Sequence, residues 1–280
     1  MKRVVFKGLA LRDNRFANWG RGIRRVLFGL FVVQSVVVWA RLCAPWPLLG
    51  NARWPEGLLL VLTAATLIAS LTRHLPGQNV MLATIIIAFI GGAAQSLGAL
   101  TGVPFGPYVY TDHIGQQLFR SLPWAVPIVW VTAILASRGI ARLMLRPWRR
   151  TSNYGFRLIG LTLLLVVLLD VGWEVFATRV KQYWFWQPTK LPFDWYGAPV
   201  TNFLGWAVAT LLILAFATPC LINKQPISRP PPDYSPLAVW LLLNLLFATG
   251  AGVRQLWPAL GLISVISIVV TVFAVRGARW

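Results

Sequence analysis

Eight apolar runs divide the chain, and no other feature of the sequence limits the possible folds as strongly. They lie near residues 26–42, 57–72, 79–100, 122–137, 156–177, 200–222, 236–250 and 256–275. A helix that spans a bilayer needs about 20 mostly apolar residues, so these runs are suited to crossing a membrane. We therefore expect an all-α polytopic transmembrane helix bundle with about eight spans, within a range of about seven to nine.

Composition excludes the soluble classes of protein. Only 12% of the 280 residues are charged and 57% are hydrophobic, whereas about a quarter of the residues in a soluble domain are charged. The chain has 26 Lys and Arg against 7 Asp and Glu, which gives a net charge of +19. In a membrane protein this excess indicates topology and contact with anionic lipid headgroups rather than nucleic-acid binding. We expect membrane lipids, and no nucleic acid, as partners.

The distribution of positive charge predicts the orientation. We divide the chain into a basic N-terminal arm, residues 1–25, and a single transmembrane domain, residues 26–280. Of the 26 Lys and Arg residues, 19 fall on the side that carries both termini. The positive-inside rule then places both termini in the cytoplasm and the protein in the cytoplasmic (inner) membrane. The loops 101–121 and 178–199, rich in Gly, Pro and aromatic residues, share the other side, where we expect a functional site.

Two acidic residues, Asp170 and Glu174, lie within an apolar run. Their spacing of four places both on one face of a helix. A charged side chain inside a membrane costs about 2.5–3.5 kcal/mol and usually faces a bundle interior, a cavity or a partner. Burial disfavours the charged form of a carboxyl group, which suits a general acid. Pairing with Arg179, or an interfacial position, is the structural alternative.

Gln95 and Asn202 are the other strongly polar side chains at comparable depth, one near the end of the third run and one opening the sixth. A side-chain amide can position water or a carboxyl group, and it can equally serve as a hydrogen-bond partner between helices. Both functions remain open at this point.

Aromatic residues are dense in the second loop, where Trp184, Phe185 and Trp186 precede Trp195 and Tyr196. Most tryptophans in a membrane protein form interfacial belts, but this cluster exceeds what a belt requires. The electron-rich faces of aromatic rings could line a site for a long isoprenoid ligand and stabilise a carbocation.

Several kinds of cofactor site are disfavoured. The two histidines are too few for a multi-histidine di-iron site, and no lysine falls inside an apolar run. The sequence has no dinucleotide-binding fingerprint and no P-loop. A single Asp-x-x-x-Glu differs from the paired Asp-rich motifs that hold magnesium and diphosphate in membrane prenyltransferases. We therefore expect no metal and no cofactor.

Two segments resemble the signatures of a family of carotenoid-biosynthesis membrane proteins. The first runs from Gln95 to Thr111 and contains Thr101, Tyr108 and Tyr110. The second comprises Asp170 and Glu174, then Trp184 and Trp186, and then the stretch from Tyr196 to Trp206 that contains Asn202. The resemblance covers about residues 91–206.

The chain departs from the family pattern at three positions. Gln95 stands where the pattern has a glutamate, Glu174 replaces an aspartate, and Val175 stands where a proline follows. The first of these changes places an amide at a position that is acidic in the family.

The family includes carotenoid hydratases, so the resemblance implies cofactor-independent addition of water to the terminal double bond of an acyclic, membrane-dissolved carotenoid. It implies Asp170 as the acid and Glu174 as the group that orients or deprotonates water. Substrate or water would contact Gln95, Thr101, Tyr108, Tyr110, Trp184, Trp186, Tyr196, Asn202 and Trp206. Association with other enzymes of the carotenoid pathway is a further expectation.

Three alternatives stay open. Protonation of the same end group without water addition would give an isomerase or a cyclase. A non-catalytic carotenoid- or lipid-binding membrane protein is the second alternative, and a transporter that uses the two carboxyl groups as a proton or cation site is the third.

Overall fold

The structure is a computed structural model that describes residues 3–44, 54–119, 121–189, 192–222 and 231–280. Its long helices are α1 (Arg3–Cys43), α2 (Trp54–Leu71), α3 (Gly77–Thr101), α4 (Ala125–Met144), α5 (Tyr154–Val175), α6 (Val200–Ala217), α7 (Ser235–Val253) and α8 (Trp257–Ala278). In the described part of the chain, eight helices are long and apolar enough to span a membrane. The prediction of an all-α bundle with about eight helices suited to crossing a membrane is therefore confirmed.

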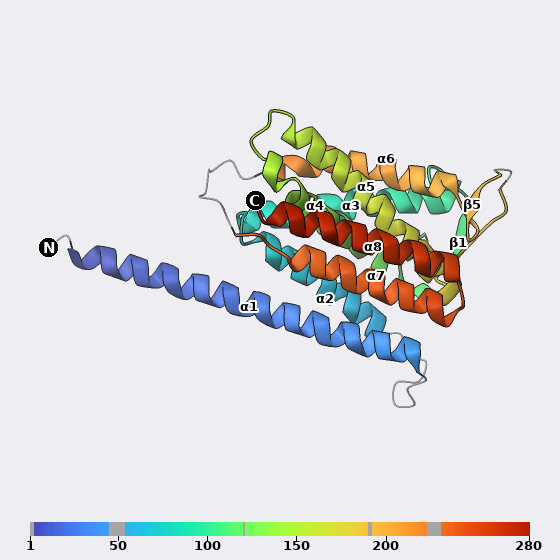
Figure 1. Cartoon of the computed structure of the whole chain (residues 1–280), viewed down its shortest axis with the longest axis horizontal. Helices are drawn as coiled ribbons and strands as arrows, with labels where there is room; N and C mark the ends of the chain where they lie inside the picture. Colours follow the sequence, from blue (N-terminus) through green and yellow to red (C-terminus); the bar gives the residue numbers. More distant parts are fainter. Residues whose placement is uncertain (1–2, 45–53, 120, 190–191, 223–230) are drawn as a thin grey trace.

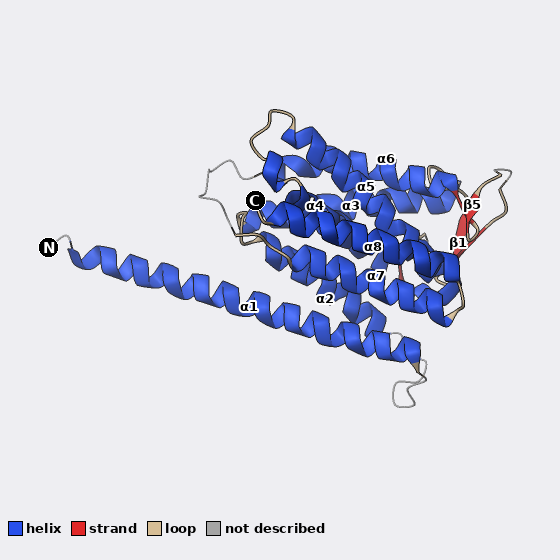
Figure 2. Ribbon diagram, in the orientation of Figure 1, coloured by secondary structure: helices blue, strands red, loops and turns tan. Residues whose placement is uncertain are grey.

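The helices form one bundle in which α4 is the most enclosed span and α1 lies on the outside (Figure 1). Helix α1 packs against α2 and α7, while α4 contacts α2, α3, α5, α7 and α8. Both termini lie at one end of the bundle, and the short strands lie at the opposite end (Figure 2). The two loops expected to carry the site therefore share one end, as the sequence predicted.

One predicted boundary was wrong. The fourth run was placed at 122–137, but Leu122 and Pro123 form a strand and α4 continues to Met144. Arg138 and Arg142, assigned to a loop, therefore lie within the helix. Arginine has a high helix propensity and a long apolar stem that can be buried, so its charge does not end a helix. Helix α1 begins at Arg3, so the described part of the basic N-terminal arm is helical.

Three short antiparallel ladders at the end opposite the termini were not predicted (Figure 2). They pair β1 (Tyr108–Tyr110) with β4 (Trp184–Trp186), β2 (Gln117–Phe119) with β3 (Leu122–Pro123), and β5 (Asp194–Trp195) with β6 (Ala198–Pro199). The connections also contain the 3₁₀ turns η1 (Asp112–Ile114), η2 (Arg146–Trp148) and η4 (Thr218–Leu221), and a π turn, η3 (Phe176–Val180), that extends α5. Aromatic residues favour extended backbone, which explains strands in these two loops.

The side chain of Phe105 packs between α3 and α6. Phe105 is fully buried, and a Cβ atom added to Gly98 of α3 or to Gly205 of α6 would lie 2.6 Å from its ring. The hydroxyl of Thr201 donates to the Phe105 carbonyl oxygen at 3.1 Å. Two glycines that face one ring thus allow the close approach of the two helices that carry Gln95 and Asn202.

Candidate functional site

The ladder between β1 and β4 joins the two sequence motifs. Tyr108 pairs with Trp186, and Tyr110 pairs with Trp184. Successive side chains of a strand point to opposite faces, so these four rings share one face of the ladder. The intervening Val109 and Phe185 are both 52% exposed on the other face. The alternation of aromatic residues therefore directs two tyrosine hydroxyls and two indole N–H groups toward the bundle.

Both indole groups donate to one carboxyl oxygen. Nε1 of Trp184 donates to Oε1 of Glu174 at 3.0 Å, and Nε1 of Trp186 donates to the same atom. Glu174 lies in the last turn of α5 and is buried. A tryptophan N–H group usually finds a partner when it is buried, so the two tryptophans of β4 fix the orientation of this carboxyl group.

Asn202 connects the two carboxyl groups of α5. Its Nδ2 atom donates to Oδ2 of Asp170 at 2.9 Å and to Oε2 of Glu174 at 3.3 Å. All three side chains are buried. The remaining oxygen of the aspartate, Oδ1, has no hydrogen-bond partner among the described residues. An amide at the start of α6 thus holds the two carboxyl groups in one cluster.

Gln95 binds the two tyrosines of β1, on the same face of the ladder as the carboxyl groups. Its Oε1 atom accepts hydrogen bonds from the hydroxyls of Tyr108 at 2.7 Å and Tyr110 at 3.4 Å. Burial raises the pKa of Tyr108 to about 12, and a hydrogen bond with Tyr110 offsets part of that effect. Burial likewise raises the pKa of Tyr110. Both phenols are therefore protonated donors at neutral pH.

These groups face a cavity of about 860 Å³ that is lined mainly by aromatic and aliphatic side chains. Trp206 lines it and stacks on Trp130, with ring centroids 4.1 Å apart. A cavity of this size, mostly apolar and with a few convergent polar groups, is typical of a site for an organic ligand. Eight predicted site residues line it, namely Gln95, Tyr108, Tyr110, Glu174, Trp184, Trp186, Asn202 and Trp206.

The other three predicted site residues do not line the cavity. Asp170 is one helical turn before Glu174 and reaches the cluster through Asn202. Thr101 caps its own helix by donating to the Leu97 carbonyl oxygen at 2.7 Å. The carbonyl oxygen of Tyr196 accepts Nε and Nη2 of Arg179 at 3.0 and 2.7 Å. Within the described residues, the side-chain hydrogen bonds of Arg179 therefore go to this carbonyl oxygen and not to either carboxyl group.

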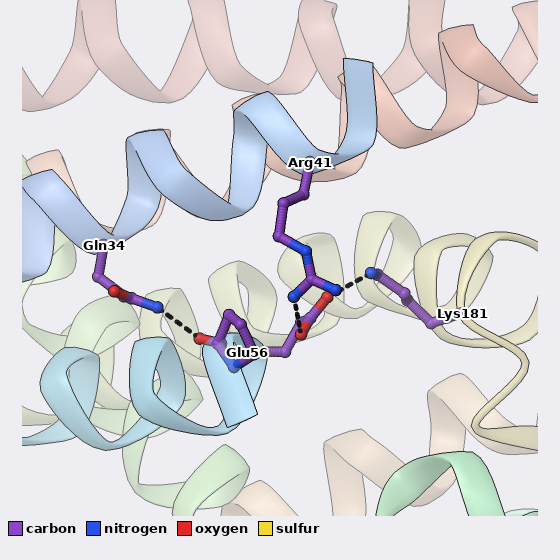
Figure 3. A network of polar contacts seen from close by, with 5 residues as sticks. Gln34, Arg41, Glu56 and Lys181 are labelled. Carbon is purple, nitrogen blue, oxygen red and sulfur yellow. Dashed lines mark hydrogen bonds and ion pairs between the residues drawn. The ribbon is translucent and has the colours of Figure 1, made fainter. Parts of the chain in front are cut away.

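A second polar group on the cavity wall was not predicted (Figure 3). Glu56 accepts Nη1 of Arg41 at 3.3 Å and Nζ of Lys181 at 2.5 Å, and so connects α2 with α1 and with the residue after η3. Glu56 lies just outside the predicted second run, 57–72, but the structure places it in the first turn of α2. An acidic residue at the start of a helix is electrostatically favourable, and this was the available signal.

Among the described residues, no three His, Cys, Asp or Glu side chains cluster as metal ligands would. The cluster of Asp170, Glu174 and Asn202 can instead donate, accept and hold protons beside an apolar cavity. This is the chemistry that the arrangement offers.

Comparison with known proteins identifies the family of the chain. The chain matches the family described as carotenoid biosynthesis proteins over residues 56–272. It is 26% identical over 135 residues to bisanhydrobacterioruberin hydratase of Haloarcula japonica, an alignment that covers 47% of this chain and 43% of that relative. No solved structure matches the chain. The family match extends over most of the chain and includes Asp170, Glu174 and Asn202. The chain therefore belongs to the carotenoid biosynthesis protein family.

Proposed function

We propose that this protein is a hydratase that adds water to the terminal double bond of an acyclic carotenoid in the membrane. One observation carries the proposal: Glu174 is held by two indole N–H groups and one amide at the wall of a largely apolar cavity. The hydratase named among the relatives supports the same reaction class. The protein would act in the cytoplasmic membrane with both termini in the cytoplasm, as the distribution of positive charge indicates.

The reaction needs a proton donor, a protected cation and one water molecule. In the first step, the Glu174 carboxyl transfers its proton to the less substituted alkene carbon. The π bond breaks, a C–H bond forms, and the other alkene carbon becomes a tertiary cation. A water oxygen then bonds to the cation, and one water proton passes to the Glu174 carboxylate. The product is a tertiary alcohol, and the acid is regenerated.

This assignment moves the role of the acid from Asp170, where the sequence suggested it, to Glu174. Asp170 was expected to be the acid, but of the two only Glu174 lines the cavity. Two buried carboxyl groups close together favour a state in which they hold one proton between them. In our proposal Asp170 acts through Asn202 as a positioning residue that keeps the transferable proton on Glu174.

The aromatic residues protect the cation. Trp184 and Trp186 lie next to Glu174, and Trp206 lines the same cavity. The face of an indole ring attracts a cation within about 6 Å, and the surrounding apolar wall excludes competing water. Gln95, Tyr108 and Tyr110 supply polar groups at the same wall, where they can hold the single water molecule that reacts.

Product analysis in carotenoid-accumulating cells tests the proposal. We expect cells that express the chain to form a carotenoid heavier by one water per reacted end, and cells that express Glu174→Gln to lack it. An unchanged mass with a shifted absorption spectrum would indicate an isomerase or a cyclase instead. The absence of any new product, at normal protein level in the membrane, would favour binding or transport.

A further inference from the structure

A second cavity, of about 80 Å³, lies at the opposite end of the bundle from the candidate site. The ends of α2 and α4, the starts of α5 and α7, and η2 surround it. This is the end that carries both termini (Figure 1). At about 30 Å³ per water molecule, the cavity has room for one small polar group but not for a lipid tail.

The lining of this cavity is strongly basic. Arg138, Arg142, Arg146 and Arg149 all line it, together with His74 and a single acidic residue, Asp233. The acidic residue is already engaged, because it forms an ion pair with Arg73 at 3.3 Å and accepts hydrogen bonds from Ser70 and from the backbone N–H of Ser235. Four arginines therefore line the cavity, and the described part of its lining contains one carboxylate, which is already engaged.

Arg138 forms no ion pair with a carboxylate of the described residues. Its side chain is buried, with 6% of the residue exposed, and its Nη2 atom donates to the Leu221 carbonyl oxygen at 2.9 Å. Its Nη1 atom has no hydrogen-bond partner in the part of the chain that the structure describes. Because a buried charge without an opposite charge is strongly unfavourable, a ligand that supplies one would be stabilised here.

His74, which also lines the cavity, is affected by the same positive charge. Burial lowers the pKa of His74, and the charge of Arg142 lowers it further. At neutral pH this side chain is therefore uncharged, and it can contribute a hydrogen bond without repelling an anion or a cation.

We propose that this cavity binds a phosphate group, with Arg138 and Arg142 as its principal donors. A guanidinium group presents several N–H donors in a fixed plane, and this geometry matches phosphate oxygens. Phosphate also suits the small volume, because only the anionic group has to enter. The site stands apart from the carboxyl cluster and does not depend on the proposed hydratase activity.

Two sources can supply the phosphate group. The cavity lies at the ends of membrane spans, where the headgroups of anionic phospholipids are found, and basic pockets between spans bind such headgroups. A free phosphate ion from the aqueous phase has the same binding chemistry. Only a lipid would also contact the apolar surface of the bundle, so the two sources are distinguishable.

Thermal unfolding of the purified full-length chain in neutral detergent tests the proposal. The probes are a short-chain phosphatidylglycerol, the matched zwitterionic phosphatidylcholine, and inorganic phosphate against chloride at equal ionic strength. A ligand that binds only the folded state raises the unfolding midpoint in a saturable way. Saturation by phosphatidylglycerol alone identifies a lipid headgroup, and saturation by inorganic phosphate at comparable affinity identifies the free ion.

Three variants locate the effect. Arg138→Met and Arg142→Met each remove a charged donor from the cavity, and a hydrogen bond to a charged group contributes about 1.5–3 kcal/mol, so we expect affinity to fall about tenfold or more. Arg254→Met removes the same charge from an exposed position at the far end of α7 and should leave the affinity unchanged.

The proposal is overturned if no probe saturates, or if the two cavity variants respond like Arg254→Met. Arg142 is only half-buried, so we expect Arg142→Met to fold. This variant decides the outcome if Arg138→Met fails to accumulate in the membrane.

Discussion

Tyr108 and Trp186 lie opposite each other in the β1–β4 ladder, with ring centroids 5.2 Å apart. Each ring carries a polar atom that reaches a different helix. The Tyr108 hydroxyl donates to Gln95 of α3, and the Trp186 indole donates to Glu174 of α5. One cross-strand pair therefore fixes the distance between the amide of the first motif and the carboxyl of the second, so the ladder is a structural part of the site.

The first prediction concerns the ionisation of Tyr108. Burial raises its pKa to about 12 from the ordinary value of 10.0. The folded chain therefore holds this proton more tightly than the unfolded chain between these two values, and the free energy of unfolding should fall as pH rises through that interval. Below about pH 10 this group adds no pH dependence. Absorbance titration of the wild type should show a phenolate transition near pH 12 that is absent from Tyr108→Phe. If the transition that the variant lacks lies near pH 10 instead, the phenol is exposed to water.

A second prediction follows from the contacts of Gln95. We expect Gln95→Glu to retain hydration, because a carboxylate oxygen can accept the same two bonds from Tyr108 and Tyr110 that the amide oxygen accepts. Gln95→Leu removes that acceptor. Tyr108 can still donate to the backbone carbonyl oxygen at position 95, which lies 2.9 Å from its hydroxyl, so the loss falls on the half-buried Tyr110, and a lost partner costs about 1–3 kcal/mol. Product yield per amount of membrane protein should separate the two variants. Equal yields from the leucine and glutamate variants would exclude a function of this acceptor.

Sequence reasoning predicted the spans well because membrane thickness imposes a length on each apolar run. Eight of the eleven predicted site residues line the cavity, because they cluster in two motifs. It could not predict which loop residues pair across the ladder, since Tyr108 and Trp186 are distant in sequence and only the folded backbone brings them together. The same limit applies to Glu56 and Lys181, which are 125 positions apart. The sequence also does not give the direction of a side chain within the bundle. It therefore did not show that Glu174 lines the cavity while Asp170 does not.

The third prediction tests the orientation of the bundle. Because 19 of the 26 Lys and Arg residues lie on the side of the termini, we expect reporters fused at either terminus to be active in the cytoplasm only. Reporters inserted in 101–121 and 178–199 should both be active on the opposite side. If these two insertions report different sides, the eight-span topology and the shared site are both wrong.

Close packing around Phe105 gives a fourth prediction. In Gly205→Ala the new Cβ atom would lie 2.6 Å from the Phe105 ring, which is fully buried. Overpacking of this kind costs about 1–3 kcal/mol, so the unfolding midpoint should fall. Gly261→Ala is the matched control, because its Cβ atom meets nothing within 4 Å and alanine is the better helix former. Equal midpoints for the two variants would show that α3 and α6 can separate without loss.

The fifth prediction concerns the carboxyl cluster itself. Glu174→Gln keeps the shape of the side chain and can still accept the indole hydrogen bonds, but it has no transferable proton. General acid catalysis contributes about 10²–10⁴-fold, so the rate of hydration should fall by that factor. The hydration rate of Asp170→Asn should also fall by about that factor if the proton of the pair depends on both carboxyl groups. The readout is product formed per unit of protein in the membrane.

The pH profile distinguishes a proton donor from its positioning residue. In our assignment Asp170→Asn alters the pH dependence of the remaining activity, because it removes the neighbour that keeps the proton on Glu174, whereas Glu174→Gln abolishes activity at every pH. If Glu174→Gln accumulates normally and hydrates at a near-native rate, the proton comes from another group. If only Asp170→Asn is inactive, the acid is Asp170, and its carboxyl must reach the substrate by a movement of Asn202, the residue that bridges the pair.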